Sequence, residues 1–88
     1  MSYTAKRISA TELPQEVRDA CYFEPEDAQD ISVITNGETV FYHLYAEDDV
    51  YWHELYNEPL VDITYHPDAH LVLTALKAAG ILDEDAGD

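Results

Sequence analysis

The pair Asn36-Gly37, set between two runs of β-prone residues, constrains the fold of this chain more than any other feature of its sequence. Residues 31–35 and 38–45 are rich in β-branched and aromatic side chains. An Asn-Gly pair accepts the positive φ values of a type I′ turn. The sequence therefore predicts a β-hairpin closed by a two-residue loop.

The register of this predicted hairpin divides its side chains between two faces. It places Asp30 across from His43. The face that we expect to form the core carries Ile31, Val33, Val40, Tyr42 and Leu44. The opposite face carries Ser32, Ile34, Thr39, Phe41, His43 and Tyr45.

Three further strands are expected around the hairpin: an edge strand at residues 3–8 and two later strands at residues 50–55 and 60–65. Turn-forming residues separate the later segments from one another and from the hairpin. Successive short strands with tight connections are typical of an antiparallel meander.

Two helices complete the expected fold. Residues 11–22 carry apolar groups at helical spacing, with Thr11 as N-cap and Pro14 in the first turn. A second helix begins at Pro67 and ends before Gly80, a residue suited to a helix C-terminus. Its apolar stripe consists of Ala69, Val72, Leu73 and Leu76.

These elements predict an α+β fold in which one domain spans residues 1–82 and an acidic tail spans residues 83–88. The domain contains an antiparallel sheet of four to five strands with an N-terminal and a C-terminal helix. We expect both helices to pack on the sheet face that carries Ile31 and Leu44.

The charge distribution is the main functional feature of the sequence. The formal net charge is −15, and the 13 carboxylates of residues 19–76 occur with no Lys or Arg among them. We therefore expect no local ion-pair neutralisation within this span. Such a field repels nucleic acid and anionic membranes, and it attracts basic surfaces over a Debye length of about 8–10 Å. The expected partner is the basic surface of a nucleic-acid-binding protein or complex, met by a monomer or a homodimer of this chain.

Other sequence features bear on location. Cys21 is the single cysteine, so no intrachain disulfide framework is expected. The first residues are not followed by an apolar signal core, and no apolar run has the length of a membrane span. We expect a cytoplasmic protein, located in the host cytoplasm if it is encoded by a phage.

The sequence offers few groups for catalysis or metal binding. His66 and His70 have the spacing of a paired metal-ligand set but lack further recognisable ligands, and His53-Glu54 lacks a second His three residues on. Cys21 lies on the apolar stripe of the first helix, as expected for a buried structural thiol. We expect no enzyme, no cofactor and no metal.

The aromatic residues Phe41, Tyr45, Tyr51, Trp52 and Tyr56 exceed what the core-facing register of a small sheet needs. They form either an aromatic contact surface rimmed by acids or a second buried face covered by a helix.

The acidity has two interpretations. Carboxylates at alternate strand positions lie about 6.8 Å apart, so a sheet edge with its loops can imitate the phosphates of DNA. Salt adaptation, in which acids replace Lys over the whole surface, is the alternative. It would make the chain a small interaction or regulatory domain without mimicry.

Four segments within roughly positions 13–52 resemble the sequences of a known protein family. They are Leu13-Pro-Gln-Glu-Val17, Pro25-Glu26, Asp30-Ile31-Ser-Val33, and Glu38-Thr-Val40 through Glu47-Asp48-Asp49 to Trp52. In these positions the chain resembles the bacteriophage inhibitors of uracil-DNA glycosylase, small acidic proteins that act as DNA mimics.

The resemblance implies an acidic strand that enters the DNA groove of an enzyme and an apolar pocket that grips one of its loops. The pocket residues here would be Val17, Cys21 and Val40. The chain departs from the pattern of that family in two ways. The strand before the first helix carries Lys6 and Arg7 instead of acids, and the chain ends in a helix rather than a strand. The resemblance therefore implies DNA mimicry, as in anti-restriction and anti-CRISPR proteins, without naming the glycosylase as target.

From these observations the sequence predicts an acidic DNA-mimic inhibitor that occludes the nucleic-acid-binding channel of a host or defence protein. The expected partner-binding residues are Glu24, Glu26, Asp27, Asp30, Glu47, Asp48, Asp49, Glu54, Glu58, Tyr45 and Tyr51.

Overall fold

A computed structural model describes residues 2–47, 49–57, 59–60 and 63–82. The expected tail at residues 83–88 lies outside them. The chain folds around a five-stranded antiparallel sheet whose strands follow one another in sequence order. The strands are β1 (Thr4–Arg7), β2 (Asp30–Thr35), β3 (Val40–Tyr45), β4 (Val50–Glu54) and β5 (Pro59–Leu60). The helices are α1 (Gln15–Ala20) and α2 (Ala69–Ala78), with 3₁₀ turns η1 (Ala10–Glu12), η2 (Pro25–Asp27) and η3 (Ile63–Tyr65). The predicted α+β class and antiparallel meander are confirmed.

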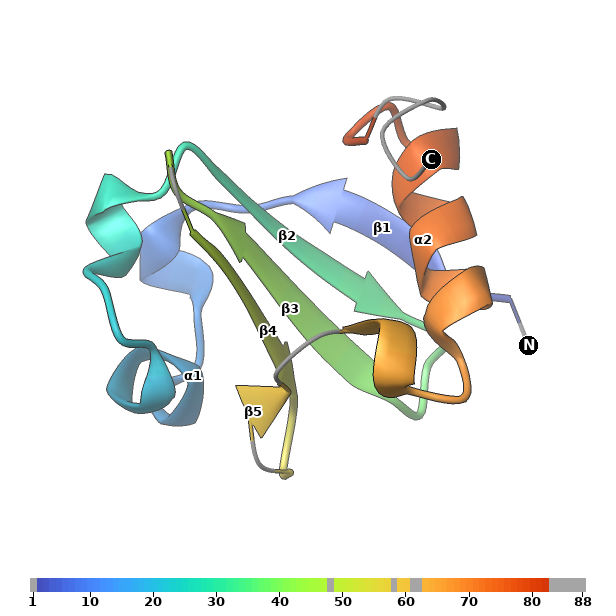
Figure 1. Ribbon diagram of the computed structural model, residues 1–88, viewed down its shortest axis with the longest axis horizontal. Helices are drawn as coiled ribbons and strands as arrows, with labels where there is room; N and C mark the ends of the chain where they lie inside the picture. Colours follow the sequence, from blue (N-terminus) through green and yellow to red (C-terminus); the bar gives the residue numbers. More distant parts are fainter. Residues whose placement is uncertain (1, 48, 58, 61–62, 83–88) are drawn as a thin grey trace.

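The two helices lie on opposite sides of the sheet, with α1 and α2 at the left and right of Figure 1. The core on the α1 side consists of Leu13, Val17, Ile31, Tyr42, Leu44 and Tyr51. The core on the α2 side consists of Tyr3, Ile34, Phe41, Trp52, Ile63, Val72, Ala75 and Leu76. The expectation that both helices share one face is therefore wrong for α2. The second face carries too much apolar surface to remain in water, and α2 buries it.

The hairpin of β2 and β3 forms, but its loop is longer than predicted. Thr35 pairs with Val40, and Asn36 Oδ1 accepts the backbone N–H groups of Glu38 and Thr39 at 2.9 and 2.8 Å. These side-chain bonds stabilise a wider turn than type I′. The pairing shifts by two residues, so Asp30 lies across from Tyr45 instead of His43. Because side chains alternate with a period of two, the shift leaves each side chain on its predicted face.

The predicted helix at residues 11–22 is divided in two by Pro14. Leu13 is extended, with φ −73° and ψ 136°, which is the conformation that a following proline favours. Thr11 consequently lies inside η1 and is no N-cap. The backbone N–H of Ser9 instead donates to the Glu12 carboxylate at 2.8 Å.

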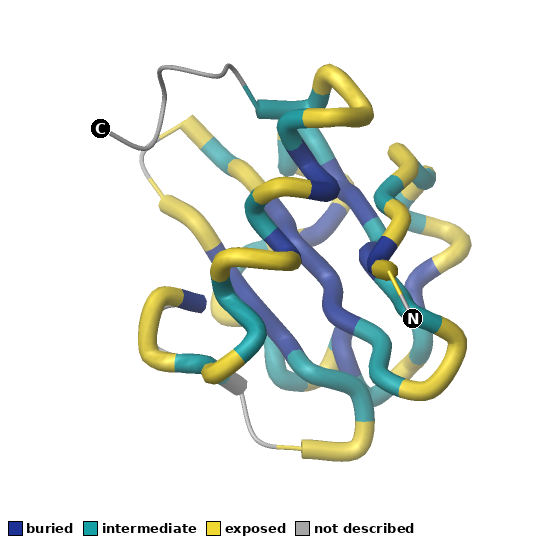
Figure 2. The backbone as a smooth tube through the Cα atoms, turned by 90° about the vertical axis from the view of Figure 1, so that its right-hand side faces the viewer, coloured by how far each residue is buried: buried dark blue, intermediate teal, exposed yellow. Residues whose placement is uncertain are grey.

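The predicted strand at residues 60–65 is wrong for residues 63–65, whereas residues 61–62 lie outside the described residues. β5 ends at Leu60, and Ile63–Tyr65 forms η3, whose Ile63 is buried in the core on the α2 side. The α2 helix begins at Ala69, two residues after Pro67, and ends as predicted before Gly80. Viewed from the α2 side, the strands are mostly buried and the outer turns of α2 are exposed (Figure 2).

Candidate functional site

Carboxylates from three segments lie at one end of the sheet, where β2 begins and β3 passes into β4. Gln29 donates its backbone N–H to the Tyr45 carbonyl at 2.7 Å, which joins the residues after η2 to the end of β3. Tyr45 in turn pairs with both Asp30 and Val50. Figure 1 shows η2 beside the turn between β3 and β4. We call the carboxylates of these segments the acidic end: Glu24, Glu26, Asp27, Asp30, Glu47 and Asp49.

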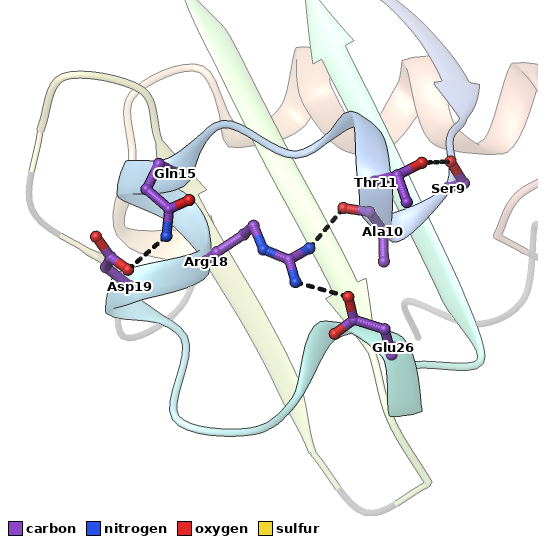
Figure 3. Close-up of polar contacts among 7 residues, drawn as sticks. All are labelled: Ser9, Ala10, Thr11, Gln15, Arg18, Asp19 and Glu26. Atoms are coloured by element: carbon purple, nitrogen blue, oxygen red, sulfur yellow. Dashed lines mark hydrogen bonds and ion pairs between the residues drawn. The ribbon is translucent and has the colours of Figure 1, made fainter.

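Two members of the acidic end are neutralised by arginines from the N-terminal part of the chain. Arg7 Nε contacts Asp30 at 2.7 Å, and one guanidinium nitrogen of Arg18 contacts Glu26 at 2.6 Å. Arg18 also donates to the Ala10 carbonyl at 2.8 Å, so it connects η1 to η2 (Figure 3). The hydrogen bond from Arg18 and one from the backbone hold the pKa of Glu26 below its ordinary value. The expectation of no ion-pair neutralisation is therefore wrong.

The four remaining carboxylates of the acidic end are exposed: Glu24, Asp27, Glu47 and Asp49. Among the described residues, none of the four takes part in an ion pair. Negative charge is therefore locally uncompensated at this surface. Such a surface favours a cationic group.

Exposed apolar groups lie beside these carboxylates. Tyr45 is 40% exposed, Val50 43% and Tyr22 63%. The Tyr22 hydroxyl donates to the Val50 carbonyl at 3.4 Å, and partial desolvation together with nearby Asp49 raises its pKa. Tyr22 was not among the predicted contacts, because the sequence placed it at the end of a helix and gave no sign that it returns to β4.

Several predicted contacts lie elsewhere. Tyr51 is only 4% exposed, because it faces the core on the α1 side and the Tyr22 ring packs edge-on against it. Glu54 lies at the opposite end of β4, where its carboxylate accepts a hydrogen bond from His66 at 3.1 Å. Both are thus removed from the acidic end. Asp48 and Glu58 lie outside the described residues.

The acidic end is built from turns rather than from an edge strand. Of its six carboxylates only Asp30 belongs to a strand, and β2 is internal to the sheet. The edge strand β1 carries Lys6 and Arg7 instead. The proposed row of carboxylates at alternate positions of an edge strand is therefore absent from the described part of the chain.

The predicted aromatic surface is largely buried. Phe41 and Trp52 are 0% and 6% exposed beneath α2 and η3, so the alternative in which a helix covers this face is confirmed for them. Tyr45 and Tyr56 remain exposed. Of the pocket residues implied by the family resemblance, Val17 is fully buried, and Cys21 and Val40 pack at the margin of the same core.

A buried polar chain links β4 to α1. The Tyr51 hydroxyl lies 2.7 Å from His53 Nδ1, and His53 Nε2 lies 3.3 Å from the Glu16 carboxylate. The same Glu16 oxygen accepts the backbone N–H of Tyr56 at 2.9 Å. Glu16 and His53 are 37 positions apart, and no pattern in the sequence indicates this contact.

The described residues offer little for covalent or metal chemistry. Burial raises the pKa of the Cys21 thiol and raises that of Tyr51 to about 12, so both groups are protonated at neutral pH. Both ring nitrogens of His66 are engaged, one with Glu54 and one with the backbone N–H of Asp68. Within the residues that the structure describes, no group of three or more candidate ligands is positioned to hold a metal ion.

Across the described ranges, no helix combines the length and the apolar character needed to cross a membrane. Comparison of the chain with protein-family models, with curated proteins and with solved structures finds no match.

Proposed function

We propose that this chain is an acidic DNA mimic that binds the nucleic-acid-binding channel of another protein and thereby inhibits it. The observation that carries the proposal is the acidic end, where four exposed carboxylates without an ion pair lie at the same end of the sheet as the exposed Tyr45. A channel that binds phosphates presents Lys and Arg, and these side chains pair with carboxylates as they do with phosphates.

The arrangement also supports a protein partner rather than a free cation. Tyr22, Tyr45 and Val50 add apolar contact area beside the charges. Protein interfaces combine buried aromatic anchors with a polar rim, whereas ion steering alone requires no such surface. The contacts of Arg18 hold η2 against η1, and the Arg7–Asp30 pair connects β1 to β2, so both help to keep the carboxylates in place.

The proposal is tested by capture followed by competition. The immobilised chain is exposed to a cell lysate, and retained proteins are eluted with a double-stranded DNA oligonucleotide. We expect a nucleic-acid-binding protein to be retained and to be released by the DNA, with retention falling steeply as salt rises. Retention that neither DNA nor salt reduces would exclude mimicry.

A pair of matched variants separates the effect of where the negative charge lies from the effect of the total charge. The first variant combines Glu47→Gln with Asp49→Asn at the acidic end. The control combines Asp19→Asn with Glu38→Gln, which removes the same charge from exposed positions elsewhere. We expect the first variant to lose about ten-fold in affinity for the captured protein and the control to lose much less. Equal losses would favour salt adaptation with no directed surface.

A further inference from the structure

Tyr56 combines two properties that are seldom found together. Its φ is +68°, and it is the one non-glycine residue with positive φ in the part of the chain that the structure describes. Its side chain is also 86% exposed. Glycine or asparagine adopts this backbone conformation more readily than a tyrosine does. A large aromatic residue here therefore strains the backbone without adding buried area to the core.

The surrounding structure holds Tyr56 in this conformation. Its backbone N–H donates to Glu16 at 2.9 Å, and Glu16 is itself bound by His53. His53 is 2% exposed and is fixed on its other side by the Tyr51 hydroxyl. A polar chain that begins in the core thus ends at the backbone of an exposed aromatic residue. Strain that the surrounding contacts over-determine is found mainly at binding and switch sites.

The charges around Tyr56 indicate what it would meet. The Glu16 carboxylate is about one-third exposed and accepts the Tyr56 backbone N–H. Burial, followed by the proximity of Tyr56 and Glu16, raises the pKa of the Tyr42 hydroxyl, which places these groups in one electronegative region. No Lys or Arg pairs with Glu16 among the described residues. A tyrosine ring in such a region suits a guanidinium group, which stacks on the ring and pairs with the carboxylate.

The geometry points to Tyr56 as an anchor that receives an arginine side chain of a protein partner, held in place by Glu16. This surface lies at the end of β4 opposite the acidic end, where the chain turns from β4 towards β5 (Figure 1). The inference rests on the proposed cationic partner and adds a second contact to it, with Arg favoured over Lys.

The test uses two short peptides, acetyl-Arg-Arg-Arg-amide and acetyl-Lys-Lys-Lys-amide, at matched ionic strength. Binding is followed by NMR at the Asn57 amide, next to Tyr56. We expect the arginine peptide to bind about three-fold more tightly than the lysine peptide at this site, in the unmodified chain and in Tyr56→Phe. The preference should be lost in Tyr56→Gly and Tyr56→Asn. Equal binding of the two peptides, or an unchanged preference in these two variants, would overturn the inference.

Two controls make the result specific. Tyr65 is 84% exposed but has no positive φ, so Tyr65→Asn should leave the preference unchanged. Tyr56→Gly should also raise the melting temperature by about 2–5 °C because it relieves strain, and a lower value would contradict the strain argument. Loss of the arginine preference in Tyr65→Asn would equally count against a site at Tyr56.

The same titration distinguishes this inference from the proposed function. In the Glu47→Gln, Asp49→Asn variant, peptide-induced shifts at the acidic end should weaken while those at Asn57 remain. If the acidic end takes up neither peptide but the preference at Asn57 persists, the proposed function fails and the anchor stands. If the acidic end binds the peptides but Asn57 shows no preference for arginine, the anchor at Tyr56 is excluded and the proposed function stands.

Discussion

His43 shows that the burial of a single residue can depend on which face of the sheet a distant helix covers. Its alternation in β3 places it on the face that α2 buries, and it is only 4% exposed. Its ring lies 4.4 Å from that of Trp52, and Ser32 is its partner across β2. Neither Ser32 Oγ nor His43 Nδ1 has a hydrogen-bond partner among the described residues. The imidazole therefore occupies an environment that disfavours its charged form.

This burial makes stability depend on pH. Desolvation lowers the pKa of His43 to about 4, while nearby Asp30 acts weakly in the other direction. The unfolded chain, with an ordinary histidine pKa of about 6.5, binds the proton first as pH falls. The contribution of His43 is thus complete above pH 6.5 and is lost as pH falls towards 4. Between pH 7 and pH 5 the loss is about 2 kcal/mol.

Urea denaturation of the unmodified chain and of His43→Leu at the two pH values measures this loss. Carboxylates also titrate in this range, so the quantity to compare is the difference between the two proteins. We expect the variant to lose about 2 kcal/mol less on acidification. Equal losses of unfolding free energy in the two proteins would show that His43 does not titrate as its burial requires.

Secondary-structure elements were predictable from the sequence where neighbouring residues alone determine them. The faces of the β2–β3 hairpin follow from alternation alone, so they survived a two-residue error in register. The extent of the first helix was not predicted, although its cause, Pro14, is visible in the sequence. Residues 63–65 of the strand expected at 60–65 form a 3₁₀ turn instead, and this turn buries Ile63 in the core on the α2 side.

The end of α2 provides a prediction at this scale. Gly80 has φ +76°, its N–H donates to the Lys77 carbonyl, and Ile81 donates to the Leu76 carbonyl, both at 3.0 Å. A Cβ at this position would meet no atom within 4 Å, so only the backbone conformation opposes a side chain. Gly80→Ala should lower the free energy of unfolding by about 1 kcal/mol, and Gly80→Asn by less. Chemical denaturation gives both values, and the reverse order would contradict this explanation.

At the scale of the whole molecule, the net charge of −15 opposes compactness, and buried apolar groups on both faces of the sheet favour it. The two ion pairs of Arg7 and Arg18 relieve only part of the repulsion. Added salt should therefore stabilise the folded chain by screening.

Circular dichroism and thermal melting in a salt series test how strongly folding depends on screening. We expect a folded spectrum at about 50 mM salt, where screening is weak, and a melting temperature that rises with salt. A chain that folds only at molar salt would instead support the salt-adapted interpretation. Sucrose at equal osmolality controls for general solute effects and should not reproduce the salt dependence.

The sequence by itself determined the features that neighbouring residues control: the alternation of β2 and β3, the turn at Asn36-Gly37, the stop at Gly80 and the total charge. The tertiary structure decided what depends on residues far apart in the chain. It placed α2 against Phe41 and Trp52, paired Arg7 with Asp30 and Arg18 with Glu26, and joined Glu16 to His53 and Tyr56. Local patterns set the conformation and facing of each segment, but only packing decides which surfaces meet and which charges remain exposed.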